Sequence, residues 1–173
     1  METLPTPDAF GHSIFCDDVR MEIRGKLTFV GCYFGAMYVH SDFPIVIPKF
    51  CISVNYWQRK NHLVLPVVFL AFLPGDSEDR ASVEFGTTEQ LTEEALEQQR
   101  RVAIESGLQD PQYEYSAIAT QIALANLTIS QPGSIKVRVR RGDKLLRIGS
   151  LRIHGVSNTT SAQQAAPPIS PPS

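Results

Sequence analysis

The longest strand-like stretch of the chain runs from Gly25 to Trp57 and predicts two β-strands joined by a turn. From Lys26 to Val39 the residues are mostly β-branched, aromatic or small, and none is proline, which suits an extended strand. Apolar side chains occupy both parities of this strand, a pattern typical of a strand that is covered on both faces. Gly31 and Gly35 interrupt it, and glycine inside a strand usually marks a bulge or a bend.

The second strand of this stretch, Ile47–Trp57, alternates more cleanly between two sets of side chains. Because successive side chains of a strand point to opposite faces, we expect one set to face the core and the other to face mostly solvent. The expected core positions are Phe50, Ile52, Val54 and Tyr56. The expected solvent-facing positions are Lys49, Cys51, Ser53, Asn55 and Trp57.

The remaining apolar segments predict further short strands, separated by turns rich in proline, glycine and aspartate. These strands are expected at His12–Val19, Leu63–Leu73, Ala81–Phe85, Tyr113–Ile129, Ile135–Arg140 and Leu145–Ile153. The last two form a β-hairpin, and a break in alternation predicts a bulge at Gly149-Ser150. The pattern as a whole predicts a mainly β fold: an antiparallel, immunoglobulin-like β-sandwich of about seven or eight strands with one inserted surface helix.

The helix is expected at Thr88–Ser106, which lacks proline and glycine and is rich in Glu, Gln, Ala and Leu. Thr88 or Thr92 can cap its start, and Gly107 follows its end. Its apolar positions are sparse, so we expect a helix lying on a surface. The outward apolar face of Leu63–Leu73 is a candidate for what it covers.

Composition divides the chain into three parts. With 173 residues and a formal net charge of −2, the sequence predicts one globular domain whose core is large enough to fold without disulfides or a structural metal. We place this domain at residues 12–155, after a flexible leader at residues 1–11. Residues 156–173 contain no charge and many Ser, Thr, Gln, Ala and Pro residues, so we expect a disordered tail there.

The cysteines and the apolar runs favour a cytoplasmic protein. Three cysteines, an odd number, argue against a disulfide framework and for a reducing compartment. No basic segment followed by an apolar run opens the sequence, so no secretory signal is predicted. The longest apolar stretch, Leu63–Leu73, is shorter than the ~20 residues of a membrane span, and we expect no membrane partner.

Two groups of residues carry a resemblance to a known family. The first group is Asp18-Val19-Arg20-x-Glu22-x-x-Gly25-Lys26-Leu27-x-x-x-Gly31-x-Tyr33-x-x-x-Met37, followed by Pro48-Lys49. The second is the late hairpin with Pro132-Gly133, Arg138-Val139 and Gly149-Ser150-Leu151. Together they resemble a family of small bacterial and phage-encoded proteins classified as a domain of unknown function, over roughly residues 12–154. The resemblance implies a β-sandwich and a bacterial or phage source, and it carries over no activity, ligand or catalytic residue.

Motifs for common chemistries are missing from the sequence. A zinc site at His12, Cys16, Cys32 and Cys51 would lack any C-x-x-C or H-x-x-x-H pair, and we interpret the cysteines as core residues. There is no nucleophile elbow, Walker loop or G-x-G-x-x-G. Asp17 and Asp18 point to opposite faces of a strand, so they form no dyad by themselves. We therefore expect no metal, no cofactor and no catalytic residue. The sequence favours a protein without enzymatic activity but does not decide the question.

The late hairpin carries a basic stripe that is a candidate binding surface. Lys136, Arg138 and Arg140 share the face opposite Ile135, Val137 and Val139, and Arg147 and Arg152 lie nearby. Such a stripe can bind the phosphate groups along a nucleic acid backbone. The region Asp76–Glu114 is strongly acidic, so the two regions can instead face each other, or the stripe can be a solvated sheet face.

Trp57 is the second candidate for contact with a partner. It is the single tryptophan and falls on the face expected to be exposed, where aromatic residues can mark a ligand or partner site. A tryptophan at a strand end can also cover the edge of its own core.

We therefore expect a non-enzymatic module that binds a protein partner or forms a homo-oligomer as an accessory or structural component of an assembly. Nucleic acid is less favoured as a partner. Two alternatives stay open. One is a carbohydrate- or nucleic-acid-binding sandwich that uses Trp57 or the basic stripe. The other is a small hydrolase with an unrecognised site.

Overall fold

The computed structural model describes residues 7–88, 92–107 and 114–156. Residues 157–173 of the predicted tail, residues 1–6 of the predicted leader and residues 89–91 of the predicted helix lie outside this part of the chain. The described residues form ten strands and one α-helix. In chain order these are β1 (Ala9–Cys16), β2 (Asp18–Met21), β3 (Leu27–Val30), β4 (Ala36–Val39), β5 (Ile45–Arg59), β6 (Val67–Phe72), β7 (Val83–Thr87), α1 (Glu93–Glu105), β8 (Tyr115–Ile129), β9 (Gly133–Arg141) and β10 (Lys144–Gly155).

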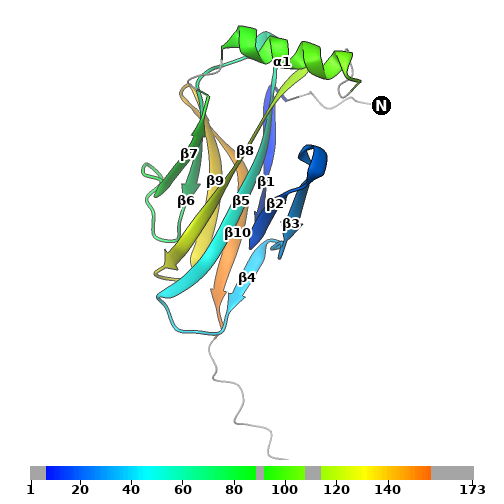
Figure 1. The fold of residues 1–173 in the computed structure, drawn as a ribbon. Coiled ribbons are helices and arrows are strands. Elements are labelled where there is room, and N and C mark those ends of the chain that lie inside the picture. Colours follow the sequence, from blue (N-terminus) through cyan, green and yellow to red (C-terminus); the bar gives the residue numbers. More distant parts are fainter. Residues whose placement is uncertain (1–6, 89–91, 108–113, 157–173) are drawn as a thin grey trace, which may run out of the picture.

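The strands form three sheets (Figure 1). One sheet has three strands in the order β1-β5-β8, and a second has five in the order β4-β10-β9-β6-β7. The third is the two-stranded hairpin β2-β3. The predicted mainly β character is confirmed. The predicted number of strands was too low, and the pairing is not wholly antiparallel, because β4 pairs with β10 in parallel.

The hydrophobic core lies between the two larger sheets. The expected core residues of β5, Phe50, Ile52, Val54 and Tyr56, are all fully buried. They belong to one cluster with inward side chains of β6, β9 and β10. Burial of the Tyr56 ring raises the pKa of its phenol to about 12. The alternation of β5 and β9 therefore fixes which face of each sheet is left for contact with other molecules.

The long strand predicted at Lys26–Val39 is instead two short strands, β3 and β4, which belong to different sheets. The break runs from residue 31 to residue 35 and is bounded by Gly31 (φ +66°) and Gly35 (φ +75°). These positive φ angles turn the chain out of one sheet and into the other, and L side chains rarely adopt them. The two glycines mark the ends of strands here, and not irregularities inside one.

Two side chains expected to face solvent, Cys51 and Ser53, are buried. They lie on the outer face of β5, which is the middle strand of its sheet, between β1 and β8. The thiol of Cys51 lies 3.6 Å from the backbone oxygen of Asp17, just before β2 begins. The segment at Asp17 thus contacts Cys51 from outside the sheet, and alternation along one strand cannot reveal a contact with a distant segment.

The predicted helix is present as α1, and Thr92 caps it by accepting a 3.1 Å hydrogen bond from the amide of Ala95. The helix lies across one end of the two large sheets (Figure 1). The sequence suggested that this helix covers the outward face of β6, and this prediction was wrong. The outward side chains of β6 pack with Ala81, from the segment between β6 and β7.

Candidate functional site

The five cations proposed as a binding surface share the outer face of the five-stranded sheet. Lys136, Arg138 and Arg140 alternate with the buried residues Ile135, Val137 and Val139 along β9. On β10, Arg147 lies directly opposite Arg138, and Arg152 lies opposite Ser134. The predicted bulge sits one residue earlier than expected, where the register shifts between Arg147 and Gly149. Gly149 is required there because a Cβ atom would lie 2.6 Å from Cβ of Ser13.

Arg138 and Arg147 form a like-charge pair across two neighbouring strands. Nη1 of Arg138 donates to the backbone oxygens of Val137 at 2.9 Å and Gly149 at 3.4 Å. Burial, and then the charge of Arg147, lower the pKa of the Arg138 guanidinium. Like charges directly opposite each other destabilise a strand pair. Within residues 7–88, 92–107 and 114–156, neither Arg147 nor Lys136 makes an ion pair.

Acidic residues border the cations on one side. They lie in the acidic loop, residues 73–82 between β6 and β7, and on β7 itself. Asp76 holds the loop in shape, because its carboxylate accepts hydrogen bonds from the amides of Leu73 and Ser82, both at 2.8 Å, and from the Ser82 hydroxyl at 2.6 Å. Although burial alone would raise the pKa of Asp76, these hydrogen bonds lower it below the ordinary value.

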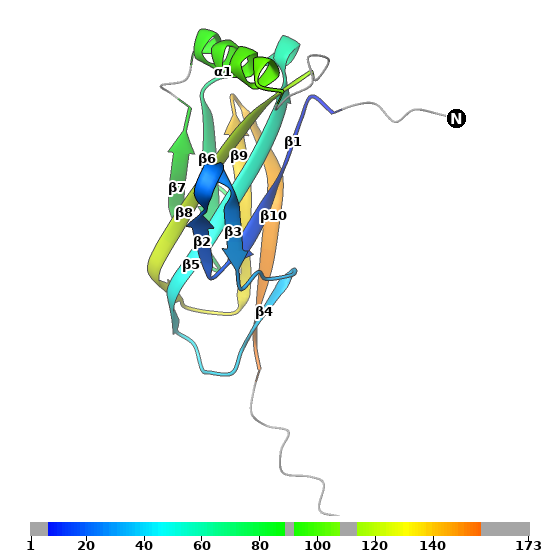
Figure 2. The same cartoon turned by 45° about the vertical axis from the view of Figure 1, so that its right-hand side comes forward.

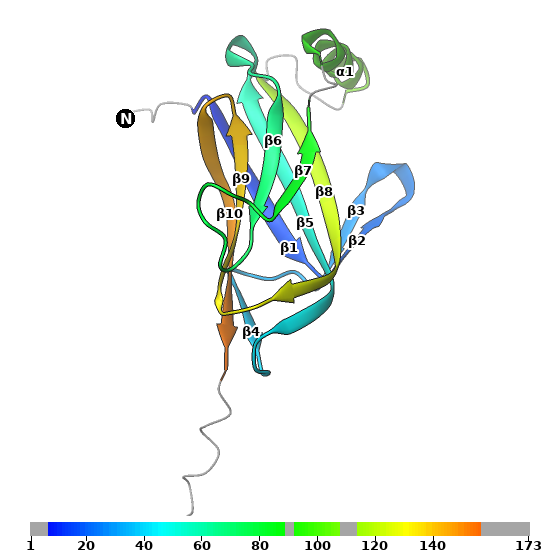
Figure 3. The ribbon, with the colours of Figure 1, turned by 90° about the vertical axis from the view of Figure 1, so that its left-hand side faces the viewer.

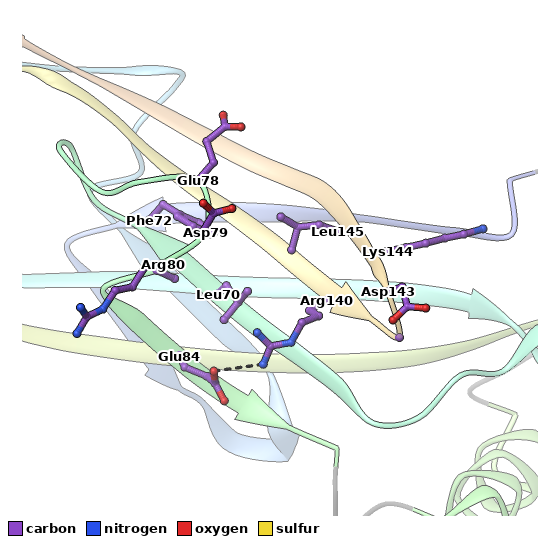
Figure 4. Close-up of a pocket in the computed structure, with 12 residues that line it drawn as sticks. Leu70, Phe72, Glu78, Asp79, Arg80, Glu84, Arg140, Asp143, Lys144 and Leu145 are labelled. Atoms are coloured by element: carbon purple, nitrogen blue, oxygen red, sulfur yellow. Dashed lines mark hydrogen bonds and ion pairs between the residues drawn. The ribbon is translucent and has the colours of Figure 1, made fainter.

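The acidic loop and the sheet enclose a cleft of about 520 Å³ (Figure 4). The residues that line it are Leu70, Phe72, Glu78, Asp79, Arg80, Ala81, Glu84, Arg140, Gly142, Asp143, Lys144 and Leu145. Inside it, Arg140 is paired with Glu84 at 3.4 Å. The other acids point in different directions (Figure 4). A second hollow of about 290 Å³ adjoins the loop and is lined by Lys136, Arg138 and Arg147 together with Ser77 and acids of the loop. The second hollow therefore brings three cations, Lys136, Arg138 and Arg147, which we call the basic cluster, together with three acids of the loop.

Trp57 lies on the other sheet, away from the cations. It occupies the outer face of β5, where the rings of Phe10 and His12 stack on the indole. The distances between ring centroids are 5.2 Å for Phe10 and 5.5 Å for His12. Trp57 is half-buried beneath these rings on the outer face of its sheet, and the structure does not bring it together with the basic residues.

The outer face of the three-stranded sheet carries almost no charge. Its positions follow from the register of β5 with β1 and β8. They are Phe10, His12, Ile14 and Cys16 on β1; Lys49, Cys51, Ser53, Asn55, Trp57 and Arg59 on β5; and Tyr115, Ala117, Ala119, Gln121, Ala123 and Ala125 on β8. Two of them are cations: Lys49 forms an ion pair with Asp18, and the guanidinium carbon of Arg59 lies 6.0 Å from the centre of the Tyr115 ring. The four alanines are exposed, so this face is flat and weakly polar.

The feature that the sequence analysis missed is the hairpin arm, residues 18–30, formed by β2, a 3-10 turn at Ile23–Gly25 and β3. The arm projects from the side of the three-stranded sheet (Figures 2 and 3). Met21 and Ile23 are 69% and 86% exposed. Phe34, which follows the arm, is 94% exposed. The available signal was the apolar character of both faces of Leu27–Val30, which indicated a surface in need of cover.

The base of the arm is fixed to the body of the protein. The phenol of Tyr33 donates a 2.5 Å hydrogen bond to Asp17, and the amide of Tyr33 donates to the backbone oxygen of Phe15 at 2.8 Å. Hydrogen bonds from Lys49 and Arg20 lower the pKa of the Asp18 carboxyl. The exposed tip is thus carried on an anchored base.

Two of the three thiols are neighbours across adjacent strands. Cys16 lies directly opposite Cys51 on the neighbouring strand, and burial, followed by the neighbouring thiol, raises the pKa of Cys16 to about 11. In the described part of the chain, no three His, Cys, Asp or Glu side chains gather as a metal-binding group. Among the same residues, no helix has the length and apolar character needed to span a membrane.

Comparison with protein-family models matches residues 12–154 to DUF6941, a family of unknown function, and the chain belongs to that family. The match has the bounds that the resemblance in the sequence suggested. Searches of curated proteins and of solved structures found no significant match.

Proposed function

We propose that this member of the DUF6941 family is a non-enzymatic protein-binding module and a component of a protein assembly, in which the hairpin arm binds a second copy of the chain. The observation that carries the proposal is the exposure of large apolar side chains on a projecting but anchored arm. Met21 and Ile23 stand at or near its tip, and Leu27 on β3 is 40% exposed.

Exposed apolar side chains that gather on a projecting element are typical of interaction surfaces. Cross-strand register places Val19, Met21, Leu27 and Phe29 on one face of the arm. Full burial of a side chain such as Met or Ile contributes about 1.5–3 kcal/mol. Burial of Met21 and Ile23 would therefore supply part of the binding free energy of a weak dimer.

A second copy fits the arm because the surface it needs lies on the same side of the molecule. The arm rises beside the outer face of the three-stranded sheet (Figure 3), and that face is nearly uncharged and lined by the small side chains of β8. Cores of protein interfaces are likewise depleted of charge. In a two-fold contact the arm of each copy lies on the sheet of the other copy. The dimer then contains two identical arm–sheet contacts.

We also propose that the two large sheets form an immunoglobulin-like sandwich. Support comes from the shared core between them and from the mainly antiparallel pairing. The parallel β4–β10 pair is a departure from a wholly antiparallel arrangement.

The test is light scattering of the purified chain over about a hundredfold range of concentration, because self-association is governed by mass action. The double variant Met21→Ser/Ile23→Ser removes the apolar tip. Val102→Ser is the matched control, because Val102 is also exposed, at 56%, but lies on α1. Circular dichroism checks that all three proteins are folded.

We expect the wild type and V102S to reach the mass of a dimer as concentration rises, and the double variant to stay a monomer. A wild type that remains monomeric throughout the range would overturn the proposal. So would a double variant that dimerises as well as the wild type.

The structure gives less support to two alternatives. Aromatic rings of β1 stack on Trp57, which leaves less of the indole free for a sugar ring. In the cleft Glu84 is already paired with Arg140, and Figure 4 shows the remaining carboxylates pointing apart, which does not favour a pair for hydrolysis.

A further inference from the structure

The basic cluster places like charges next to each other on the two neighbouring strands β9 and β10. Arg138 and Arg147 lie opposite each other, and Lys136 follows two positions along β9 on the same face. In the described residues Arg140, which shares this face, is paired with Glu84, whereas Lys136 and Arg147 have no such partner. Natural proteins violate the rules of strand pairing mainly where function requires it. Lys136 and Arg147 therefore have donors that are open to an external anion, although acids of the loop line the same hollow.

The geometry of the cluster suits a single anionic group. The guanidinium of Arg138 is held by two backbone oxygens, so its position is fixed before any ligand binds. Arginine presents a planar fork of donors that matches carboxylate and phosphate oxygens. Arg138, Arg147 and Lys136 line one hollow of about 290 Å³, which Ser77 also lines.

The surroundings favour an acidic peptide over a nucleic acid. Asp76, Glu78 and Asp79 line the same hollow. Each strand of a DNA duplex carries one phosphate for about every 3.4 Å of helix axis, so a bound nucleic acid would bring further phosphates towards these carboxylates. A peptide can place one or two anionic side chains on the cations and neutral residues elsewhere.

We propose that the basic cluster binds an anionic side chain, a carboxylate or a phosphate, on an acidic segment of a partner protein. The site lies on the outer face of the five-stranded sheet, and Figure 3 shows the acidic loop and the hairpin arm on opposite sides of the molecule. The proposal is independent of self-association through the arm. It gives the module a second surface, so that one copy can bind another copy and an acidic partner at the same time.

The acidic loop sets the selectivity of this site. Its Glu78 and Asp79 stand beside the basic cluster, where they repel a dense polyanion and leave room for an isolated anionic group. The loop is held in place by Asp76 through hydrogen bonds to the amides at its two ends, Leu73 and Ser82.

The experiment measures binding of fluorescent peptides to the full chain by anisotropy at low salt. The probes are a short peptide with adjacent glutamates, the same peptide with phosphoserines in their place, the same peptide with glutamines, and a single-stranded oligonucleotide. The first two probes distinguish a carboxylate from a phosphate source. The protein variants are Arg147→Gln and, as a control, Arg101→Gln, which removes an exposed arginine of α1 that is 3.7 Å from Glu97.

We expect the glutamate or phosphoserine peptide to bind and the glutamine peptide not to bind. R147Q should lose about tenfold or more in affinity, the effect of one charge-assisted hydrogen bond, while R101Q should bind like the wild type. Absence of binding by both acidic peptides at low salt would overturn the proposal. Equal affinities of R147Q and the wild type, or tighter binding of the oligonucleotide than of either peptide, would do so as well.

Discussion

Replacing Arg147 by glutamate should increase the free energy of unfolding, even though the change removes a residue of the proposed anion site. Arg147 lies directly across from Arg138, so the wild-type pair is repulsive and the glutamate variant has an attractive pair in the same place. Cross-strand pairs contribute roughly 0.2–1 kcal/mol each, with the opposite sign for like charges. Removing one effect and adding the other should stabilise the sheet by about 0.5–2 kcal/mol.

Urea denaturation at low salt is the suitable assay, since it gives the free energy of unfolding with its slope. A change of 1 kcal/mol corresponds to roughly 2–4 °C in melting temperature for a domain of this size. Arg152→Glu is the control, because Arg152 faces Ser134 and not a cation across the strands. Added salt should shrink the gain of R147E, because it screens exposed charges.

A variant R147E that is less stable than the wild type would mean that the acids of the loop already neutralise Arg147. An equal gain in R152E would mean that the effect does not come from the pair Arg138–Arg147. Either result would contradict the proposed repulsion and remove the support it gives to an anion site at the basic cluster.

Three further changes test the local structure. Gly31→Ala should destabilise the chain by more than about 1 kcal/mol in urea denaturation, because its Cβ would lie 2.0 Å from Oδ2 of Asp17, whereas Gly35→Ala, with a similar φ and open space around it, should cost less. Thr92→Ala should remove the cap of α1 at a cost of about 1 kcal/mol, seen as faster amide exchange in the first turn. Hydrogen bonds hold the pKa of Asp76 below its ordinary value of 3.8, so its carboxylate stabilises the fold above that pH, and the contribution is lost as the pH falls through the lowered value. Amide exchange in residues 73–82 should therefore rise at low pH, and Asp76→Asn should show the fast exchange already at neutral pH.

The sequence predicted best where one strand alternates over many residues. The inner face of β5 and the three buried residues of β9 were identified correctly, because the period of a strand decides both. Placement of the basic residues on one face followed from the same rule. The sequence offered Thr88 and Thr92 as caps of α1, because threonine before an acidic turn is a local signal, and the structure assigns the cap to Thr92.

What the sequence did not reveal depends on contacts between distant segments. The division of Lys26–Val39 into β3 and β4 requires knowing that Gly31 and Gly35 adopt positive φ angles, and glycine permits many others. The parallel pairing of β4 with the last strand is a long-range contact. The hairpin arm was missed because strands as short as β2 and β3 show too few alternations to be recognised.

The most direct test of the proposed assembly is hydrogen–deuterium exchange of the chain at two concentrations, one where light scattering gives a dimer and one where it gives a monomer. We expect protection at the higher concentration to be confined to the amides of residues 18–30 and of β8, and the amides of the five-stranded sheet to be unchanged. Protection on β9 and β10 instead, or an identical exchange pattern in dimer and monomer, would contradict it.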